Sequence, residues 1–322
     1  MTASGSDRGK QNIVIRGYGP YFDVATPAGV VLCTVRGSVK RERRKTDPVA
    51  VGDEVTISLT GNDEGIIEAV APRRRALSRL KRGTDDVEQV ILANPDQLVA
   101  VFAVAEPEPH PRMLDRFLLI AEAGGLASVV TVNKIDLDPA GELRYLFDPY
   151  REAGYPVIET SAAESAGLDE LRRRLTGKVS ALAGPSGVGK SSLINALWPE
   201  RAEQALRVGA ISGATGKGRH TTTSTHLMIL DEDTYVADTP GLRALRPWGI
   251  DLNRLDRYFP EFRPYLGRCY YLDCTHVDEP GCAVIAAVEA GTINRERYQS
   301  YLIMREALAE EPSTSRFRRR SS

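Results

Sequence analysis

Short apolar runs separated by turn residues dominate the first part of the chain. From Ile13 to about Ala71, stretches rich in Val, Ile and Thr recur at roughly ten-residue intervals, with Gly, Pro and Asp between them. Four or five strands with this spacing predict a small barrel or sandwich. A five-stranded β-barrel of the oligonucleotide-binding type (OB-fold) is the favoured interpretation for residues 1–75.

The hydrophobic pattern changes after residues 76–94, which we interpret as a linker with a break at 83–86. Beyond it, apolar strands alternate with amphipathic helices, an arrangement typical of a parallel sheet covered by helices on both faces. We therefore predict an α/β domain over residues 95–247. Its expected strands are 98–105, 128–133, 156–159 and 179–183, and its expected helices are 111–123, 140–152 and 168–175.

The last part of the chain has a third pattern. A short helical stretch at 251–258 precedes a cluster of cysteines, and residues 282–311 are mostly helix formers with Gly291 as a break between two helices. We predict a mostly α-helical domain over residues 248–312 and a basic, disordered tail over 313–322. A multidomain chain also agrees with the length of 322 residues, which exceeds that of one ordinary domain.

Charge changes this picture only when it is divided by region. Hydrophobic residues make up 42% and charged residues 26% of the chain, as in folded proteins, and the net charge of −1 argues against a surface that binds a polyanion everywhere. Basic side chains nevertheless concentrate at 40–45, 73–82 and 316–320, whereas an acidic run lies at 231–233. These patches favour RNA binding, and simple solvated loops are the alternative.

The location of the protein follows from what the sequence lacks. The first residues contain no apolar core of the kind that a signal peptide needs. The longest apolar stretch, 98–105, is far shorter than the roughly 20 residues of a membrane span. We expect a soluble, cytoplasmic protein without a membrane partner.

One glycine-rich motif predicts a nucleotide site. Residues 184–191 fit G-x-x-x-x-G-K-[ST], follow an apolar strand and open a helical run, as a phosphate-binding loop does. Backbone N–H groups of such a loop surround phosphate oxygens, Lys190 neutralises the terminal phosphates and Ser191 supplies a hydroxyl to Mg²⁺. The predicted contact residues are Gly184, Pro185, Ser186, Gly187, Val188, Gly189, Lys190, Ser191 and Ser192.

Two further motifs select guanine. Residues 133–136 fit N-K-x-D, in which Asp136 accepts hydrogen bonds from guanine N1–H and the exocyclic amine, Lys134 lies along the nucleoside and Asn133 ties this loop to the phosphate loop. Ser161 and Ala162 fit the short motif whose backbone N–H meets guanine O6. Each motif alone is weak, but together at strand ends they predict GTP as the ligand.

The D-x-P-G motif at Asp238–Gly241 completes the set and shows that its order is unusual. Asp238 is expected to hold Mg²⁺ through water, and the Gly241 N–H to contact the γ-phosphate. The guanine motifs precede the phosphate loop, so the domain is circularly permuted. All loops still converge, because ligands bind at the carboxyl ends of the strands whatever their connection.

The region between the phosphate loop and Asp238 holds the candidate switch. Residues 209–220 are rich in glycine and lead into three threonines. Thr222 and Thr223 are expected to contact the nucleotide, and Thr223, or else Thr222, is expected to bind Mg²⁺. A polar run without a ligand is the alternative. Leu242 stands where many GTPases place the glutamine that orients water, so His220 is the candidate catalytic residue.

The cysteine cluster predicts one structural Zn²⁺. Cys269, Cys274, His276 and Cys282 offer three thiolates and one imidazole, a closed set of four ligands. Three reduced cysteines in a loop are the alternative. A catalytic zinc is disfavoured because four protein ligands leave no open position.

Together these motifs resemble the RsgA family, bacterial GTPases that depend on the small (30S) ribosomal subunit. The resemblance covers nearly the whole chain and rests on the barrel, the permuted motifs, G-R-H-T-T-T, D-T-P-G-L and C-x4-C-x-H-x5-C. It implies a GTPase that binds the maturing subunit and its rRNA, is stimulated by it, and leaves after hydrolysis; we expect a monomer. A GTP-dependent RNA-binding switch in translation control and a zinc metalloenzyme regulated by nucleotide are the alternatives.

Overall fold

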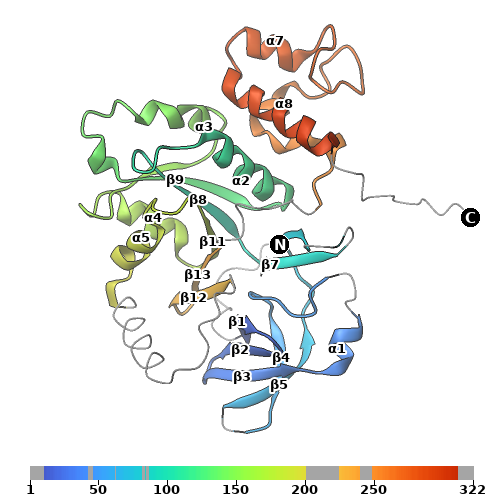
Figure 1. Ribbon diagram of the computed structural model, residues 1–322, viewed down its shortest axis with the longest axis vertical. Helices are drawn as coiled ribbons and strands as arrows, with labels where there is room; N and C mark the ends of the chain where they lie inside the picture. Colours follow the sequence, from blue (N-terminus) through green and yellow to red (C-terminus); the bar gives the residue numbers. More distant parts are fainter. Residues whose placement is uncertain are drawn as a thin grey trace, which may run out of the picture.

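A computed structural model describes residues 11–42, 46–61, 63–81, 84, 87–200, 225–239 and 249–310. Figure 1 shows the chain in three parts: blue strands at the bottom, green and yellow strands with their helices in the middle, and orange and red helices at the top. Eleven strands form one continuous hydrogen-bonded sheet that runs from the middle part into the lower one. No helix of the described residues is long and apolar enough to cross a membrane.

The N-terminal part is a five-stranded barrel, as predicted. Its strands are β1 (Ile13–Tyr18), β2 (Tyr21–Thr26), β3 (Gly29–Val35), β4 (Val55–Leu59) and β5 (Glu64–Val70), in the order β1-β2-β3-β5-β4. A bridge between Ile13 and Glu54 joins the two ends of this order, and so closes the ring. Alternate side chains fill the interior, among them Val14, Val24 and Cys33. The lone cysteine of the N-terminal half is thus a core residue.

Two segments near the barrel differ from the prediction. The basic stretch expected to be a loop begins as a short helix, α1 (Gly37–Glu42). The expected linker at 76–94 contains an antiparallel pair of strands, β6 (Ala76–Leu80) and β7 (Glu88–Ala93). Of the predicted break at 83–86, only Thr84 belongs to the described residues. Leu77 and Leu92 are buried with the core of the next domain, which is why this segment is ordered.

The middle part is the predicted α/β domain. Its parallel strands are β8 (Gln97–Ala103), β9 (Ala127–Asn133), β10 (Val157–Glu159), β11 (Val179–Ala183) and β13 (Thr234–Asp238), and β12 (His226–Asp231) runs antiparallel to β13. All seven residues of β8 are buried. Leu98, Ala100 and Phe102 contribute to one core, and the residues between them contribute to another, because successive side chains point to opposite faces.

Helices cover both faces of this sheet. One face packs against α2 (Pro111–Ala123) and α3 (Asp148–Glu152), and the other packs against α4 (Leu168–Leu175) and α5 (Lys190–Leu197). The helix expected over 140–152 is shorter than predicted: the 3₁₀ turn η3 (Arg144–Phe147) precedes α3. Gly141 has a positive φ of 75° and Pro149 lies at the start of α3, so regular helix does not extend across this segment.

The barrel attaches to this sheet through one pair of strands. β1 pairs antiparallel with β12, with Arg16 opposite His226. β12 is the strand that leads, through β13, to Asp238. The barrel therefore extends the edge of the sheet that carries part of the candidate nucleotide site.

The C-terminal part consists of η5 (Leu252–Tyr258), η6 (Pro260–Tyr265), α7 (Ala283–Glu289) and α8 (Arg295–Glu310). Gly291, with a φ of 76°, lies between the last two helices, as expected. Phe259, Phe262 and Tyr301 form the centre of a separate core, in which the rings of Phe262 and Tyr301 lie 5.0 Å apart.

A buried arginine joins this C-terminal part to the α/β domain. Arg297 of α8 is 3% exposed, and its guanidinium donates to Asp115 Oδ1 of α2 at 2.5 Å and to Glu261 Oε1 of η6 at 2.8 Å. Burial opposes the charge, but the two carboxylates raise the pKa of Arg297 above its ordinary value. Ser300 also donates to Asp115, so both carboxylate oxygens of this residue have partners.

Candidate functional site

The predicted phosphate loop lies between β11 and α5 and has the backbone that its glycines allow. Gly184, Gly187 and Gly189 have φ angles of 158°, 82° and 92°, which L side chains rarely adopt. A Cβ on Gly184 would lie 2.1 Å from Val101 O, so only glycine fits against β8 there. Lys190 Nζ donates to the carbonyl oxygens of Gly184 and Pro185 at 3.1 and 3.2 Å, so the lysine folds back over the loop.

Asn133 joins the guanine motif to the phosphate loop, as the sequence predicted. Its Nδ2 donates to Val188 O at 2.8 Å, and its side chain is buried. A Cβ on Gly189 would lie 2.3 Å from this same Nδ2 atom. The amide therefore occupies the space that a side chain at Gly189 would need, and its hydrogen bond to Val188 O keeps it there.

Asp136 is held by the second guanine motif. Ser161 Oγ donates to Asp136 Oδ1 at 2.5 Å, so the ends of β9 and β10 meet in one place. The Ser161 N–H donates to Ala166 O at 3.0 Å. In this motif, the backbone N–H that can donate to a base is therefore that of Ala162.

Lys134 is placed by a loop that the sequence did not single out. It has a left-handed backbone with φ of 63°, and its Nζ donates to the carbonyl oxygen of Glu106. Glu106 follows β8, and the neighbouring Pro107 lies close to Gly187, where a Cβ would be 3.8 Å from the proline Cδ. The loop after β8 thus touches both the guanine motif and the phosphate loop.

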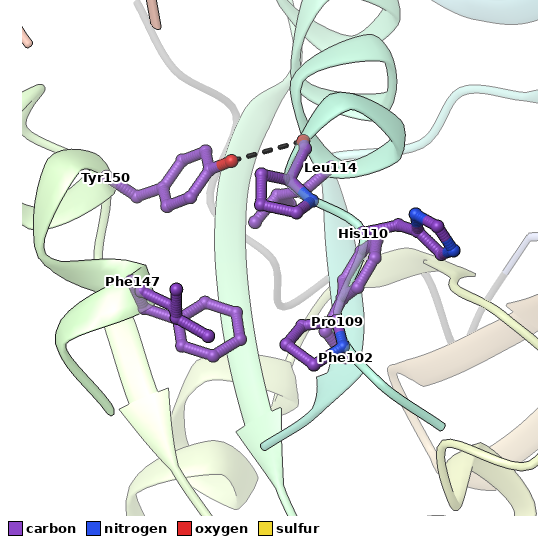
Figure 2. A pocket seen from close by; sticks show the side chains of 8 residues that line it. Phe102, Pro109, His110, Leu114, Phe147 and Tyr150 are labelled. Atoms are coloured by element: carbon purple, nitrogen blue, oxygen red, sulfur yellow. Dashed lines mark hydrogen bonds between the residues drawn. The ribbon is translucent and has the colours of Figure 1, made fainter. Parts of the chain in front are cut away.

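This loop leads into α2 across a tightly filled crevice (Figure 2). Phe102, Leu114 and Phe147 line it, and the Tyr150 hydroxyl donates to Pro111 O at 3.1 Å across its top. The crevice has no room for even a water molecule, so it is a packing contact at the start of α2.

The carboxylate expected to face Mg²⁺ lies at the end of β13. Asp238 Oδ1 is buried and has no hydrogen-bond partner among the described residues, which is costly unless a ligand or ion completes it. The next residue, Thr239, is fixed by two hydrogen bonds to Leu182 O at the end of β11. The carboxylate of Asp238 and the hydroxyl of Ser191 are both oxygen ligands of the kind that a hydrated Mg²⁺ takes.

Several predicted site residues lie outside the described part of the chain. They are the switch residues His220, Thr222 and Thr223 and the residues Gly241 and Leu242 of the D-x-P-G-L segment. The side chains of the basic stretch at 40–45 and the tail at 313–322 also lie outside it.

The four predicted zinc ligands converge at one point. The Nδ1 atom of His276 lies 3.6, 3.4 and 3.3 Å from the sulfur atoms of Cys269, Cys274 and Cys282, and the sulfurs of Cys269 and Cys282 are 3.9 Å apart. Zn–S bonds of about 2.3 Å and Zn–N bonds of about 2.0 Å place tetrahedral ligand atoms roughly 3.5 to 3.8 Å apart. The cluster therefore has the donors and the spacing for one structural Zn²⁺.

Neighbouring groups fix these ligands. His276 Nε2 lies 3.6 Å from Asp256 Oδ2, an outer carboxylate of the kind that orients a metal-bound imidazole. Backbone N–H groups of Ala283 and Ile285 donate to the sulfurs of Cys269 and Cys282 at 3.4 and 3.5 Å. These contacts favour the thiolate form that a zinc ligand needs.

Three residues that support the two sites were not predicted from the sequence. Thr160 Oγ1 donates to Asn133 Oδ1 at 3.2 Å and so fixes which way the amide points. Its position directly before Ser161 was a usable signal, because strand ends carry the site. No local signal marked Asp256 or Glu106, since their contacts depend on how distant segments pack.

Two family models match this chain: the RsgA N-terminal domain over residues 11–67 and the RsgA GTPase over residues 70–248. A protein of Gemmatimonas aurantiaca named small ribosomal subunit biogenesis GTPase RsgA is 45% identical over 299 residues, covering 92% of this chain and 96% of the relative. A protein of Chlorobaculum tepidum with the same name is 43% identical, covering 92% of this chain and 98% of the relative.

Solved structures agree with this. YjeQ from Thermotoga maritima superposes with a TM-score of 0.74 at 35% identity, covering 94% of this chain and 99% of that one. YloQ, described as a circularly permuted GTPase, superposes with a TM-score of 0.69 at 27% identity, covering 94% and 96%.

Proposed function

The chain belongs to the RsgA GTPase family, and from this premise we propose that it hydrolyses GTP to GDP and phosphate while it assists late maturation of the small ribosomal subunit. The subunit stimulates hydrolysis, and the protein leaves the subunit after hydrolysis. It acts as a monomer in the cytoplasm and contacts the rRNA of the subunit.

The observation that carries the nucleotide part of this proposal is the hydrogen bond from Asn133 Nδ2 to Val188 O. It joins the guanine motif to the phosphate loop although these segments are 55 residues apart and in permuted order. Asp136, held by Ser161, faces the N1–H and amine of guanine, and the Ala162 N–H donates to O6. Adenine offers neither of the two donors that Asp136 requires.

The phosphates bind at the N-terminus of α5. Backbone N–H groups of Ser186 to Ser192 surround them, and Lys190 exchanges its carbonyl partners for phosphate oxygens. Mg²⁺, when bound, neutralises charge that develops on the phosphates, and Ser191, Asp238 through water, and Thr223 or Thr222 hold it. Asp238 Oδ1, which is buried and has no hydrogen-bond partner within the described part of the chain, supports that assignment.

The attacking water needs a group that Leu242 cannot provide, because an alkyl side chain forms no hydrogen bond. We assign this role to His220, whose imidazole positions the water or accepts its proton. Intrinsic hydrolysis is then slow until the subunit orders the switch. Loss of stimulated turnover in His220→Ala with unchanged GTP affinity is the expected result, and unchanged turnover would exclude the assignment.

The chain divides into the barrel at 1–75, the GTPase domain at 95–247 and the zinc-binding domain at 248–312, with residues 76–94 between the first two. The barrel and the zinc-binding domain supply the subunit contacts, and GTP controls when these contacts form. A GTP-dependent RNA-binding switch in translation control is the second candidate, because the barrel type and the basic segments suit RNA of many kinds.

The deciding experiment measures GTP hydrolysis with and without purified small subunits, with large subunits and free rRNA as comparisons. We expect strong stimulation by small subunits alone, and none in Lys190→Ala, which lacks the phosphate contact. Equal stimulation by free rRNA favours the RNA-binding switch. No stimulation at low salt contradicts both candidates.

A further inference from the structure

A cleft of about 530 Å³ lies beside the cysteine cluster, away from the nucleotide site. One part of its lining comes from η5 and η6, with Asp256, Arg257 and Arg263, and another part is the loop between two zinc ligands, with Tyr271 and Leu272. Holding the metal uses only the sulfurs and the imidazole. The arginines, the tyrosine and the leucine of this cleft have no role in the zinc site itself.

The loop between Cys269 and Cys274, which we call the knuckle, packs against Gly281 and has an apolar tip. The Tyr270 N–H donates to Gly281 O at 3.1 Å, and a Cβ on Gly281 would lie 2.9 Å from Tyr270 Cβ, so the two segments are in close contact. Leu272 at the tip is 102% exposed and Tyr270 is 79% exposed. Exposed apolar groups on a rigid support mark an interaction site, since binding them costs little ordering entropy.

The other wall carries Arg257 and Arg263, and hydrogen bonds fix the side chain of Arg263. Arg263 donates to Glu122 Oε2 of α2 at 2.6 Å and to Arg257 O at 3.2 Å. Arg257 and Arg268 are exposed. The acidic group of this wall, Asp256, already contacts His276. Glu122 is the carboxylate that pairs with Arg263, and Asp273 lies exposed on the knuckle beside Leu272.

Guanidinium groups opposite an aromatic ring and an apolar side chain suit a nucleotide, which combines a phosphate with a planar base. The volume lies in the range of single-ligand pockets. A base in a duplex is stacked and paired, and so cannot enter beside the knuckle, whereas an unpaired base can be turned out and stacked on a tyrosine.

We propose that this cleft binds one unpaired nucleotide of the small-subunit RNA, with its phosphate on Arg257 and its base against Tyr271 and Leu272. The inference rests on the proposed function, which supplies the RNA partner. Charged surfaces of the protein make the remaining contact with the RNA. The cleft adds to them a site next to the zinc that receives one base. The zinc then serves to hold the knuckle in the shape that receives the base.

The test uses the full, zinc-loaded chain and a short single-stranded RNA that carries the photoreactive base 4-thiouridine. Binding is measured by fluorescence anisotropy, and the cross-linked peptide is identified by mass spectrometry. The test variants are Tyr271→Ala, Leu272→Ala and Arg257→Gln. Matched controls are Arg254→Gln, an exposed arginine of the same turn outside the cleft lining, and Leu143→Ala, an exposed leucine of the α/β domain outside the barrel and the cleft.

We expect cross-links at residues 270–272 and a loss of affinity of about fivefold or more in Tyr271→Ala and Arg257→Gln, the lower end of the range for one stacked base. The two controls should change affinity less than twofold, and duplex RNA should bind equally to all variants. Zinc content, measured on every variant, shows whether the knuckle is intact; Tyr271→Phe, which keeps the ring, should restore binding.

Four results overturn the proposal. They are unchanged binding in all cleft variants, equal losses in Arg254→Gln and Arg257→Gln, competition by free nucleoside monophosphate at similar affinity, and loss of subunit binding without loss of RNA binding. The last result indicates a protein partner for the knuckle. Stimulation of GTP hydrolysis by small subunits is measured separately on the wild-type chain. Absence of that stimulation would contradict the proposed function, whereas the binding results above concern the cleft alone.

Discussion

At the scale of single residues, the nucleotide site depends on pairs whose shapes exclude other side chains. Gly189 and Asn133 are the clearest pair, because the space that a methyl group on Gly189 would need is filled by Asn133 Nδ2 at 2.3 Å. The amide cannot move away without losing Val188 O or Thr160 Oγ1. A small change in the phosphate loop should therefore disturb the guanine loop as well.

Gly189→Ala tests this pair. We expect the affinities for GTP and GDP to fall roughly tenfold or more, because the methyl group displaces the amide and the alanine adopts an unfavourable backbone conformation. Titration with a fluorescent GDP analogue measures the change. Gly154→Ala is the control, since Gly154 has nearly the same φ, 91° against 92°, with nothing within 4 Å of the added Cβ. Equal losses of nucleotide affinity in both variants would mean that backbone strain alone, and not the contact with Asn133, causes the loss.

Asp136→Asn tests the choice of base. An amide presents a donor where guanine N1–H and the amine require an acceptor, so GTP affinity should fall about a hundredfold. Xanthosine triphosphate, which carries a carbonyl in place of that amine, should bind the variant better than the wild type. Competition binding with both nucleotides measures the exchange. An unaltered preference for GTP would show that Asp136 does not contact the base.

At the scale of elements, the C-terminal part depends on its four ligands. The core around Phe262 is small, and the cysteine-bearing segment of 269–282 contains little regular structure. Metal binding then supplies much of the free energy that orders this segment. The nucleotide site uses none of these residues, so the two functions should separate.

Cys282→Ser is expected to lower the zinc content of the chain, make residues 249–310 sensitive to protease and leave GTP affinity unchanged. Chelator-linked zinc assays, limited proteolysis and nucleotide titration measure the three outcomes. The control is Cys33→Ser, which alters a buried cysteine of the barrel that lies outside the cluster. Full zinc content in Cys282→Ser would contradict the ligand assignment.

At the scale of the whole molecule, one guanidinium connects the zinc-binding part to the GTPase sheet. Arg297 bonds to Asp115 and Glu261 and lies 5.0 Å from the centre of the Phe259 ring. Removing it leaves the buried carboxylates of Asp115 and Glu261 without their positively charged partner, although Asp115 keeps the Ser300 hydroxyl. Such a change lowers the stability of the fold by more than the intact ion pair contributes to it, because the remaining carboxylate charge stays buried away from water.

Arg297→Met should lower the free energy of unfolding by about 3 kcal/mol or more. In Arg297→Met combined with Asp115→Leu, the loss should be smaller than the sum of the two single losses, with a coupling of about 1 kcal/mol or more. Urea unfolding of the three variants measures this. Additive losses would mean that Arg297 and Asp115 act independently.

Charge also acts at this scale, since the net charge of −1 is an average over basic patches and acidic regions. Replacing Arg41, Arg43 and Arg44 together by glutamine should weaken binding to small subunits and reduce its salt dependence, without a change in GTP affinity. The same change at Arg172, Arg173 and Arg174, three exposed arginines of α4, is the control. Co-sedimentation over a range of salt concentrations compares them, and equal effects would argue against a contact at the barrel.

Features with a short-range pattern could be predicted from the sequence. The phosphate loop, the N-K-x-D motif and the zinc ligands each occupy a few neighbouring positions, because their chemistry needs fixed spacing on one loop. The alternating barrel strands and the helices 111–123 and 168–175 were also predictable, since burial imposes a period on the side chains. Permutation did not hide the site, because strand ends meet regardless of chain order.

Only the tertiary structure decided the contacts between distant segments. Arg297 and Asp115 are 182 residues apart, and neither has a local pattern that names its partner. The same holds for the β1–β12 pairing that attaches the barrel, for Glu106 beside Lys134 and for Asp256 behind His276. The strands β6 and β7 form in place of the predicted linker because Leu77 and Leu92 pack into the core of the α/β domain. The spacing of residues within a loop determines which chemistry the loop can perform. The packing of the whole chain determines which other segments surround that loop.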